Sequence, residues 1–98
     1  MDEQRMRAAA EAHAQAVLDG DMDHVTEDIH PDHREAVFAA AAAMPNPVTS
    51  AEVVDVRVDG EQGIADLHYG DEDSSMLLRS VWVEVDGRLQ AISVSVVG

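Results

Sequence analysis

The spacing of apolar residues changes once along this chain, at the segment MPNPV over residues 44–48. Before this segment, apolar residues recur every three to four positions, which is the repeat of an amphipathic helix. After it, they alternate with polar residues, which is the repeat of a β-strand. Two prolines so close together end a helix firmly. The chain is therefore predicted to be an α+β protein, with N-terminal helices packed on a curved antiparallel sheet.

The first half of the chain contains the start and stop signals of three helices, over about residues 2–19, 22–29 and 31–44. Gly20 can end the first helix in a left-handed conformation, Asp21 can cap the second, and Pro31 can open the third. The residues on one stripe of the first helix are Met6, Ala10, His13, Ala14 and Val17. The expected buried side of the third helix holds His33, Ala36, Val37, Ala40 and Met44.

The second half predicts a meander of four strands, over about residues 51–59, 63–69, 75–85 and 88–97. Asp86-Gly87 is a signal for a two-residue hairpin turn. If the turn has only these two residues, Val85 faces Arg88. The register then continues through the pairs Val83–Gln90, Val81–Ile92, Arg79–Val94 and Leu77–Val96.

This register leaves neither face of the sheet clearly polar. One face carries Val, Ile and Leu around Arg79, and the other carries small, apolar and serine side chains. Helices can cover only one face, so we expect a homodimer that packs through the sheet. The residues expected at that interface are Met76, Leu78, Trp82, Ala91 and Ser93.

Length and charge limit the partners of this chain. Its 98 residues are enough for one domain with a small core. It has 20 acidic residues against 6 basic ones, all of them arginine, and a net charge of −14. Phosphate binding needs clustered Lys and Arg, so nucleic acid and an anionic membrane surface are disfavoured as partners. The acidic exterior either keeps the protein soluble or steers a basic partner.

Features that the sequence lacks limit its expected cellular location and chemistry. The chain has no cysteine, which excludes disulfides and thiol catalysis. An N-terminus without a signal-peptide pattern, and no run of about 20 apolar residues, make the cytoplasm the expected location. A lysine-free composition rich in Ala, Asp, Val and Arg is typical of a GC-rich bacterial genome. No nucleophile motif, phosphate loop or dinucleotide fingerprint occurs, so no cofactor is predicted.

The segment DGDMDHVTEDIHPDH, residues 19–33, is dense in possible metal ligands. Asp19, Asp21 and Asp23 imitate the start of a calcium loop, but His24 and His30 stand where that loop needs Gly and Glu. Its histidines also lack a recognised zinc spacing. We therefore predict no metal site, and interpret the segment as helix caps and turns.

Two polar residues lie within apolar patterns and are candidates for a site. His13 is either a core histidine bonded to backbone or a carboxylate, or an acid/base group lining a pocket. Arg79 either pairs with an acidic residue at the sheet edge or holds an anionic group in a cavity. The second strand puts Asp66 and His68 on one face and Leu67 and Tyr69 on the other, and the loop length leaves open which pair joins Arg79. The candidate ligand-binding residues are His13, Asp66, His68 and Arg79.

Two segments then resemble a known superfamily. AVLDGDMDHVTEDIHPD, residues 16–32, is similar to the helix-Gly-Asp-helix segment of nuclear transport factor 2-like proteins. VWVEVDGRLQAISV, residues 81–94, is similar to their closing hairpin. This superfamily includes ketosteroid isomerase and polyketide-cyclase-like members and has a cystatin-like cone fold. The resemblance implies a curved sheet around a long first helix, an internal pocket, and frequent dimerisation through the sheet.

The chain departs from that superfamily in two ways. Pro31 follows Ile29 almost directly, where many relatives carry extra short strands, so this is a small, truncated member. It also lacks a counterpart of the isomerase Asp base with its Tyr/Asp oxyanion pair. We therefore expect a non-catalytic dimerising module that binds a small molecule or a protein partner. The alternative is an isomerase or cyclase with His13 as general base and Arg79 or Tyr69 contacting an oxyanion.

Overall fold

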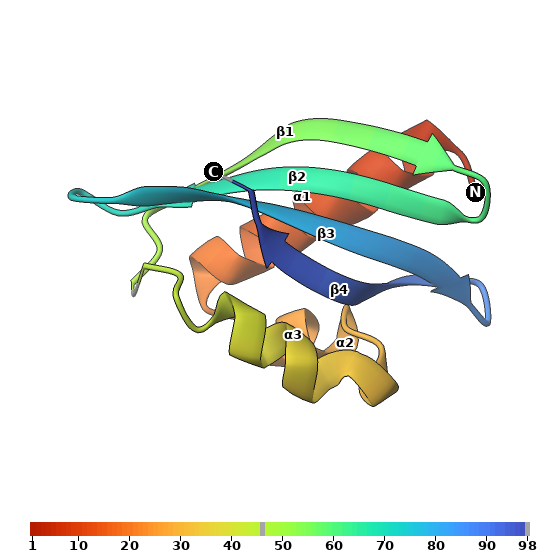
Figure 1. Ribbon diagram of the computed structural model, residues 1–98, viewed down its shortest axis with the longest axis horizontal. Coiled ribbons are helices and arrows are strands. Elements are labelled where there is room, and N and C mark those ends of the chain that lie inside the picture. Colours follow the sequence, from red (N-terminus) through yellow and green to blue (C-terminus); the bar gives the residue numbers. More distant parts are fainter. Residues whose placement is uncertain (46, 98) are drawn as a thin grey trace.

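A computed structural model describes residues 1–45 and 47–97 of the chain. The helices are α1 (Glu3–Asp19), α2 (Met22–Glu27), the 3-10 helix η1 (Pro31–His33) and α3 (Arg34–Ala41). The strands are β1 (Ser50–Asp59), β2 (Gln62–Gly70), β3 (Ser75–Val85) and β4 (Arg88–Val96). The strands form one antiparallel sheet in chain order. The predicted α+β class and four-stranded meander are therefore confirmed (Figure 1).

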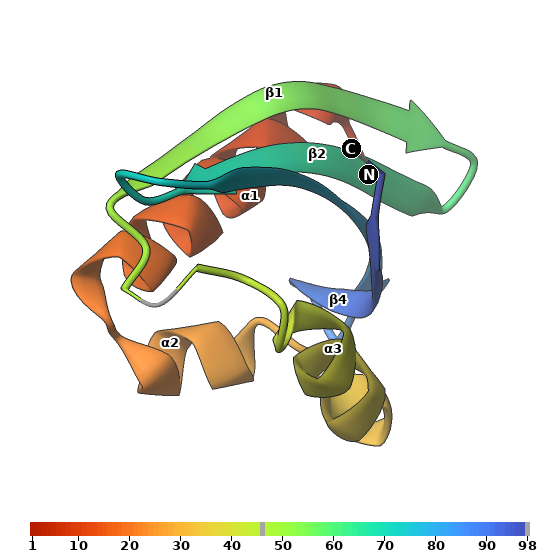
Figure 2. The same cartoon turned by 60° about the vertical axis from the view of Figure 1, so that its left-hand side comes forward.

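The sheet curves over the helices, which all lie on its inner face (Figure 2). α1 runs along β1 and β2, α3 packs against β4, and α2 packs against α1 (Figure 1). The main core fills the space between α1 and the sheet, with Trp82, Met6 and Leu67 as its largest fully buried side chains. A second cluster of Ala16, Val25, Ile29 and Val37 lies beneath α2 and α3.

The predicted helix caps at the first joint are present. Gly20 has φ 70°, and its N–H bonds to the carbonyl groups of Ala16 and Val17. The Asp21 carboxylate accepts a hydrogen bond from the backbone N–H of His24 at 3.2 Å. These two residues turn the chain so that α2 lies beside α1.

The second and third helices are shorter than predicted. After α2 the chain pairs with β4, because Asp28 accepts a backbone bond from Ala91 at 2.7 Å and His30 donates one back at 2.9 Å. Pro31 opens a 3-10 turn, and α3 itself covers only Arg34–Ala41. In α3 Val37 is buried, whereas His33 and Ala36, predicted to be buried, are exposed. The 3-10 geometry of η1 removes His33 from the α-helical phase on which that prediction depended.

A β-bulge at Ile92 changes the predicted register of the last hairpin. Val85–Arg88 and Val83–Gln90 pair as expected, but Trp82 pairs with Ala91 and Val81 with Ser93. The extra residue shifts all later pairs, so the predicted pairs Val81–Ile92, Arg79–Val94 and Leu77–Val96 are wrong. Val94 now faces Ser80 on the inner side of the sheet.

This register also corrects the predicted dimer interface. Leu78, Trp82 and Ala91 are buried in the core of their own chain. Met76 packs against the same core, and Ser93 is exposed on the opposite, outer face. The predicted set therefore mixes the two faces, and most of it is unavailable to a partner. The outer face, which the helices leave open, carries Ile64, Val81 and Val83.

Candidate functional site

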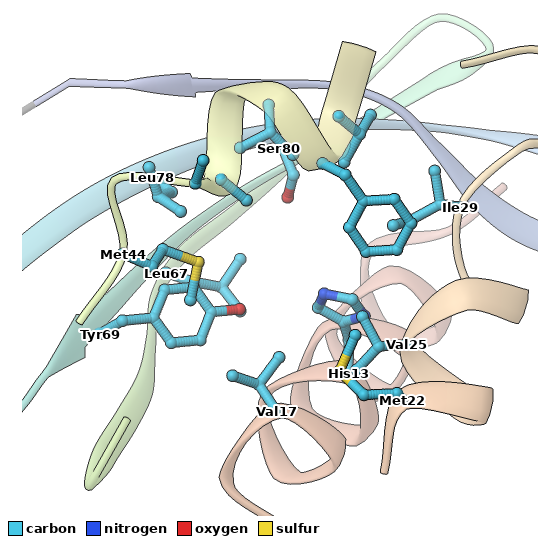
Figure 3. Close-up of a pocket in the computed structure, with 15 residues that line it drawn as sticks. His13, Val17, Met22, Val25, Ile29, Met44, Leu67, Tyr69, Leu78 and Ser80 are labelled. Atoms are coloured by element: carbon cyan, nitrogen blue, oxygen red, sulfur yellow. The ribbon is translucent and has the colours of Figure 1, made fainter. Parts of the chain in front are cut away.

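A pocket of about 320 Å³ opens between the three helices and the inner face of the sheet (Figure 3). Most of its lining is aliphatic, with one aromatic ring from α3, and three side chains bring polar groups. The lining residues are His13, Val17, Met22, Val25, Ile29, Val37, Phe38, Ala41, Ala42, Met44, Leu67, Tyr69, Leu78, Ser80 and Val94. No arginine or carboxylate belongs to this lining.

His13 reaches the pocket from α1 and is held by a buried carboxylate. Its Nδ1 lies 2.9 Å from Oδ2 of Asp28, the residue that ends α2. Asp28 is 7% exposed, and its Oδ1 accepts a hydrogen bond from the Arg88 guanidinium at 3.1 Å. His24 Nε2 lies 3.2 Å from the same Oδ2. An aspartate from the helix joint is thus contacted by side chains from three elements.

This contact fixes the orientation and the tautomer of the His13 ring. The Asp28 carboxylate, paired with the Arg88 guanidinium through Oδ1, only accepts hydrogen bonds, so His13 Nδ1 carries the hydrogen that Oδ2 accepts. The edge of the ring also packs against Trp82, with centroids 5.5 Å apart and an interplanar angle of 83°. In neutral His13 the Nε2 atom is therefore left as a hydrogen-bond acceptor. Figure 3 shows the imidazole directed into the pocket.

Tyr69 brings a hydroxyl group to the same space from β2. Its side chain is buried, and Figure 3 shows its hydroxyl directed into the pocket toward the side that His13 occupies. Burial raises the pKa of Tyr69 well above its ordinary value, and the negative charge of Asp28 adds to this. The hydroxyl therefore stays neutral and can donate a hydrogen bond. No protein partner for it occurs among residues 1–45 and 47–97.

Ser80 is the third polar group of the pocket. Its hydroxyl donates to the carbonyl oxygen of Ala65 at 3.1 Å and accepts from the indole N–H of Trp82 at 2.8 Å. A serine hydroxyl has one hydrogen and two lone pairs, so one lone pair remains. Ser80 can accept one further hydrogen bond, from water or from a ligand.

Arg79, predicted as a partner of His13, lies on the outer face of the sheet. Its guanidinium bonds both oxygens of Asp66, at 2.9 Å and 3.2 Å. This hydrogen bonding holds the pKa of Asp66 below its usual value, although burial opposes the shift. The requirement that His13 and Arg79 share one cavity is therefore not met.

The remaining predicted ligand residues, like Arg79, lie on the outer face of the sheet and away from the pocket. His68 lies on the outer face with Asp66, opposite Leu77 of β3. The question left open by the loop length is thus answered: Asp66 and His68 share a face with Arg79, and Tyr69 shares the pocket with His13. Of the four predicted ligand residues, only His13 lines the pocket.

Sequence reasoning missed Asp28 as the partner of His13. The two residues are 15 positions apart, and the turn at Gly20 brings them together. The one signal was general: a histidine within an apolar stripe needs a polar partner, and acidic residues are dense in the segment after the turn. In the described part of the chain, no group of three or more His, Asp or Glu side chains could hold a metal ion.

Comparison with known proteins identifies the fold of this chain. No protein-family model matches the sequence, and no curated protein matches it. Among solved structures, the chain is similar to an NTF-2-like protein of unknown function from Burkholderia xenovorans LB400. The TM-score is 0.68 at 18% sequence identity, over 97% of this chain and 83% of that one. This chain has the nuclear transport factor 2-like fold.

The NTF2-like fold was the implication of the two sequence segments, and the structural likeness confirms it. At 18% identity the likeness concerns the fold and carries no role for individual residues. The role of the NTF2-like pocket must therefore be argued from its own side chains. Within the described residues, no helix is long and apolar enough to cross a membrane.

Proposed function

We propose that this protein binds a small, largely apolar molecule in the pocket between its helices and the inner face of its sheet. The observation that carries the proposal is the Asp28-bound His13 ring, directed into a largely apolar space of about 320 Å³. Ligand sites are typically apolar hollows with a few placed polar groups. Here His13, Tyr69 and Ser80 supply those groups, and the aliphatic lining supplies the area that excludes water.

The side chains at the mouth support this proposal. Met22 and Phe38 both line the pocket, and they are 56% and 37% exposed. Exposed apolar surface at the rim of a groove is a feature of ligand-binding sites. An apolar ligand would cover them and remove this surface from water.

A pair of substitutions on α3 tests the proposal. Ala41 lines the pocket, whereas Ala39 is exposed on the same helix and does not. Neutral bicyclic probes titrated against the ¹⁵N-labelled protein should shift resonances of pocket residues. Ala41→Phe should abolish these shifts by filling the space, and Ala39→Phe should leave them. Shifts that are absent in the unmodified protein, or that persist unchanged in Ala41→Phe, would contradict ligand binding at this place.

The His13–Asp28 contact also favours a second candidate, proton transfer by an isomerase- or cyclase-type enzyme. His13 Nε2 would take a proton from a carbon next to a carbonyl group, and the C–H electron pair would form the C=C bond of an enolate. The carbonyl π electrons would move to oxygen, where the Tyr69 hydroxyl donates a hydrogen bond. His13 would then return the proton to carbon. Asp28 would orient the ring and stabilise its charged form.

Exchange of carbon-bound hydrogen tests this second candidate. The protein would be incubated with 2-tetralone in D₂O, and deuterium uptake beside the carbonyl would be followed by NMR. Catalysis by His13 predicts faster uptake than in buffer, and loss of the acceleration in His13→Gln. Uptake at the buffer rate would rule out this chemistry for that ketone, and binding would remain as the function.

We further propose that two copies of the chain associate through the outer face of the sheet. Half-buried Ile64, Val81 and Val83 lie on this face to one side of the Asp66–Arg79 pair, and the helices of the same chain do not cover them. Light scattering at tens of micromolar should give the mass of a dimer. Val81→Arg should give a monomer, and Val97→Arg, at an exposed site after β4, should not. A monomeric unmodified protein would contradict the proposal.

The cytoplasmic location and bacterial origin expected from the sequence stay predictions.

A further inference from the structure

The pocket offers more hydrogen-bond acceptors than donors, and this difference restricts the kind of ligand that it can bind. His13 Nε2 accepts, because Nδ1 carries the hydrogen that points to Asp28. Ser80 can only accept, because its one hydrogen is already donated to Ala65. Tyr69 can both donate and accept, and its raised pKa keeps it neutral. The pocket therefore offers two acceptors and one group of mixed character.

Charge restricts the ligand further. None of the lining residues is an arginine or lysine, so a carboxylate or phosphate would lose its hydration without a permanently charged partner. Arg88, which reaches the carboxylate that holds His13, is already bonded to Asp28 at 3.1 Å and lies 3.5 Å from Glu27. The whole chain also carries a net charge of −14, which repels anions. A neutral ligand avoids these costs.

Size sets the third restriction. An apolar cavity of about 150 Å³ holds one benzene ring. The pocket here is about 320 Å³, roughly twice that volume. Two fused six-membered rings would fill such a space without leaving it partly empty.

We infer that the ligand is a neutral molecule of about two fused rings that carries a hydroxyl group, and that the pocket prefers this alcohol or phenol to the matching ether or ketone. This inference rests on the proposed small-molecule function. The ligand hydroxyl donates to His13 Nε2 and accepts from the Tyr69 hydroxyl, so both groups are satisfied. An ether or a ketone accepts only, and it leaves the buried nitrogen of His13 without a partner.

The test compares two probes that differ in one hydrogen-bond donor, 2-naphthol and 2-methoxynaphthalene. Calorimetric titration at about pH 8, above the ordinary pKa of histidine, should show that 2-naphthol binds about tenfold more tightly, the effect of one unmade buried hydrogen bond. In His13→Phe this ratio should fall close to one, because the acceptor is gone. Tyr69→Phe should weaken 2-naphthol binding but keep part of the preference.

Asp28→Asn provides a variant in which the preference for the hydroxyl should be lost. Arg88 can only donate, so the amide oxygen of the new side chain turns to Arg88 and its NH₂ group faces His13. Nδ1 then accepts, Nε2 carries the hydrogen, and the pocket donates at that point. In this variant the affinity for 2-methoxynaphthalene should rise relative to the affinity for 2-naphthol. This readout holds even if His13→Phe does not fold.

The outcomes separate this inference from the function on which it rests. Equal affinity for both probes, blocked in both cases by Ala41→Phe, would overturn the hydroxyl preference and leave small-molecule binding intact. An unchanged preference in folded Asp28→Asn would overturn the role assigned to the His13 tautomer. Binding of neither probe would contradict both the ligand class and the proposed pocket.

Discussion

Nδ1 of His13 lies 2.9 Å from the carboxylate of Asp28, and this contact joins the long first helix to the residue that ends the second. The same carboxylate accepts from Arg88 on β4, so one buried aspartate connects α1, α2 and the sheet. The contact therefore supports the fold and also sets the hydrogen-bonding character of the pocket.

Removing this carboxylate should destabilise the protein. Asp28→Ala leaves His13 without a partner for Nδ1 and Arg88 without its buried acceptor, so the free energy of unfolding should fall by about 1–3 kcal/mol. Glu11→Ala, at an exposed site on α1, should change it by less than about 0.5 kcal/mol. Urea unfolding measures both. Equal effects of the two substitutions would contradict the structural role of Asp28.

Tyr69 should resist ionisation in the folded protein. Its pKa is raised in the folded state, so folding favours the neutral hydroxyl, and this stabilisation is lost as the pH rises above the unfolded-state value of 10.0. Tyr69 is the only tyrosine of the chain, so its absorbance near alkaline pH can be followed without interference from another phenol. Tyrosinate should form only as the protein unfolds. A titration centred near the ordinary value in folded protein would show that the hydroxyl is solvated.

The outer face predicts a different pH dependence. Arg79 lowers the pKa of Asp66 in the folded state, so Asp66 contributes stability above the unfolded value of 3.8. That contribution is lost as the pH falls through the lower, folded value. Asp66→Asn should therefore be less stable than the unmodified protein at neutral pH, and the difference should shrink in strong acid. Asp55→Asn, at a half-exposed site, serves as control, and a difference for Asp66→Asn that does not change with pH would contradict the prediction.

Gly63 on β2 packs closely against α1, and its backbone conformation is one that other residues can adopt. A methyl group there would contact the Sδ and Cγ atoms of Met6, a fully buried residue of α1. Gly63→Ala should lower the free energy of unfolding by about 1–3 kcal/mol through overpacking. Combining it with Met6→Ala should give a loss smaller than the sum of the two single losses, because the shortened side chain makes room. Strictly additive losses would show that α1 does not press on β2 here.

The order of elements could be predicted because local signals determined it. The change of apolar spacing at residues 44–48 separated helices from strands, and Gly20 and Asp21 fixed the first joint through their own backbone and side-chain bonds. The bulge at Ile92 could not be predicted in this way. Ala91, Ser93 and Ser95 alternate with Ile92, Val94 and Val96 as in a regular strand, and nothing in this alternation marks an extra residue.

The positions of the site residues depended more on tertiary contacts than on local sequence signals. In the β2–β3 loop Asp71 accepts from the backbone N–H groups of Asp73 and Ser74, which makes a short turn and sets Gly70 opposite Ser75. The length of this turn could not be predicted from the apolar pattern. This register sends Arg79 to Asp66 and Tyr69 to the pocket. A periodic pattern identified His13 as unusual, but no pattern could show that Asp28 would meet it across a helix joint.

The hydrogen on the His13 ring is the most direct test of the account. Long-range ¹H–¹⁵N correlation spectra of the labelled protein, recorded above the ordinary pKa of histidine, distinguish the two neutral tautomers. We expect hydrogen on Nδ1, bonded to Asp28, and an unprotonated Nε2. Hydrogen on Nε2 instead would contradict the Asp28 contact and the preference for a hydroxyl ligand derived from it.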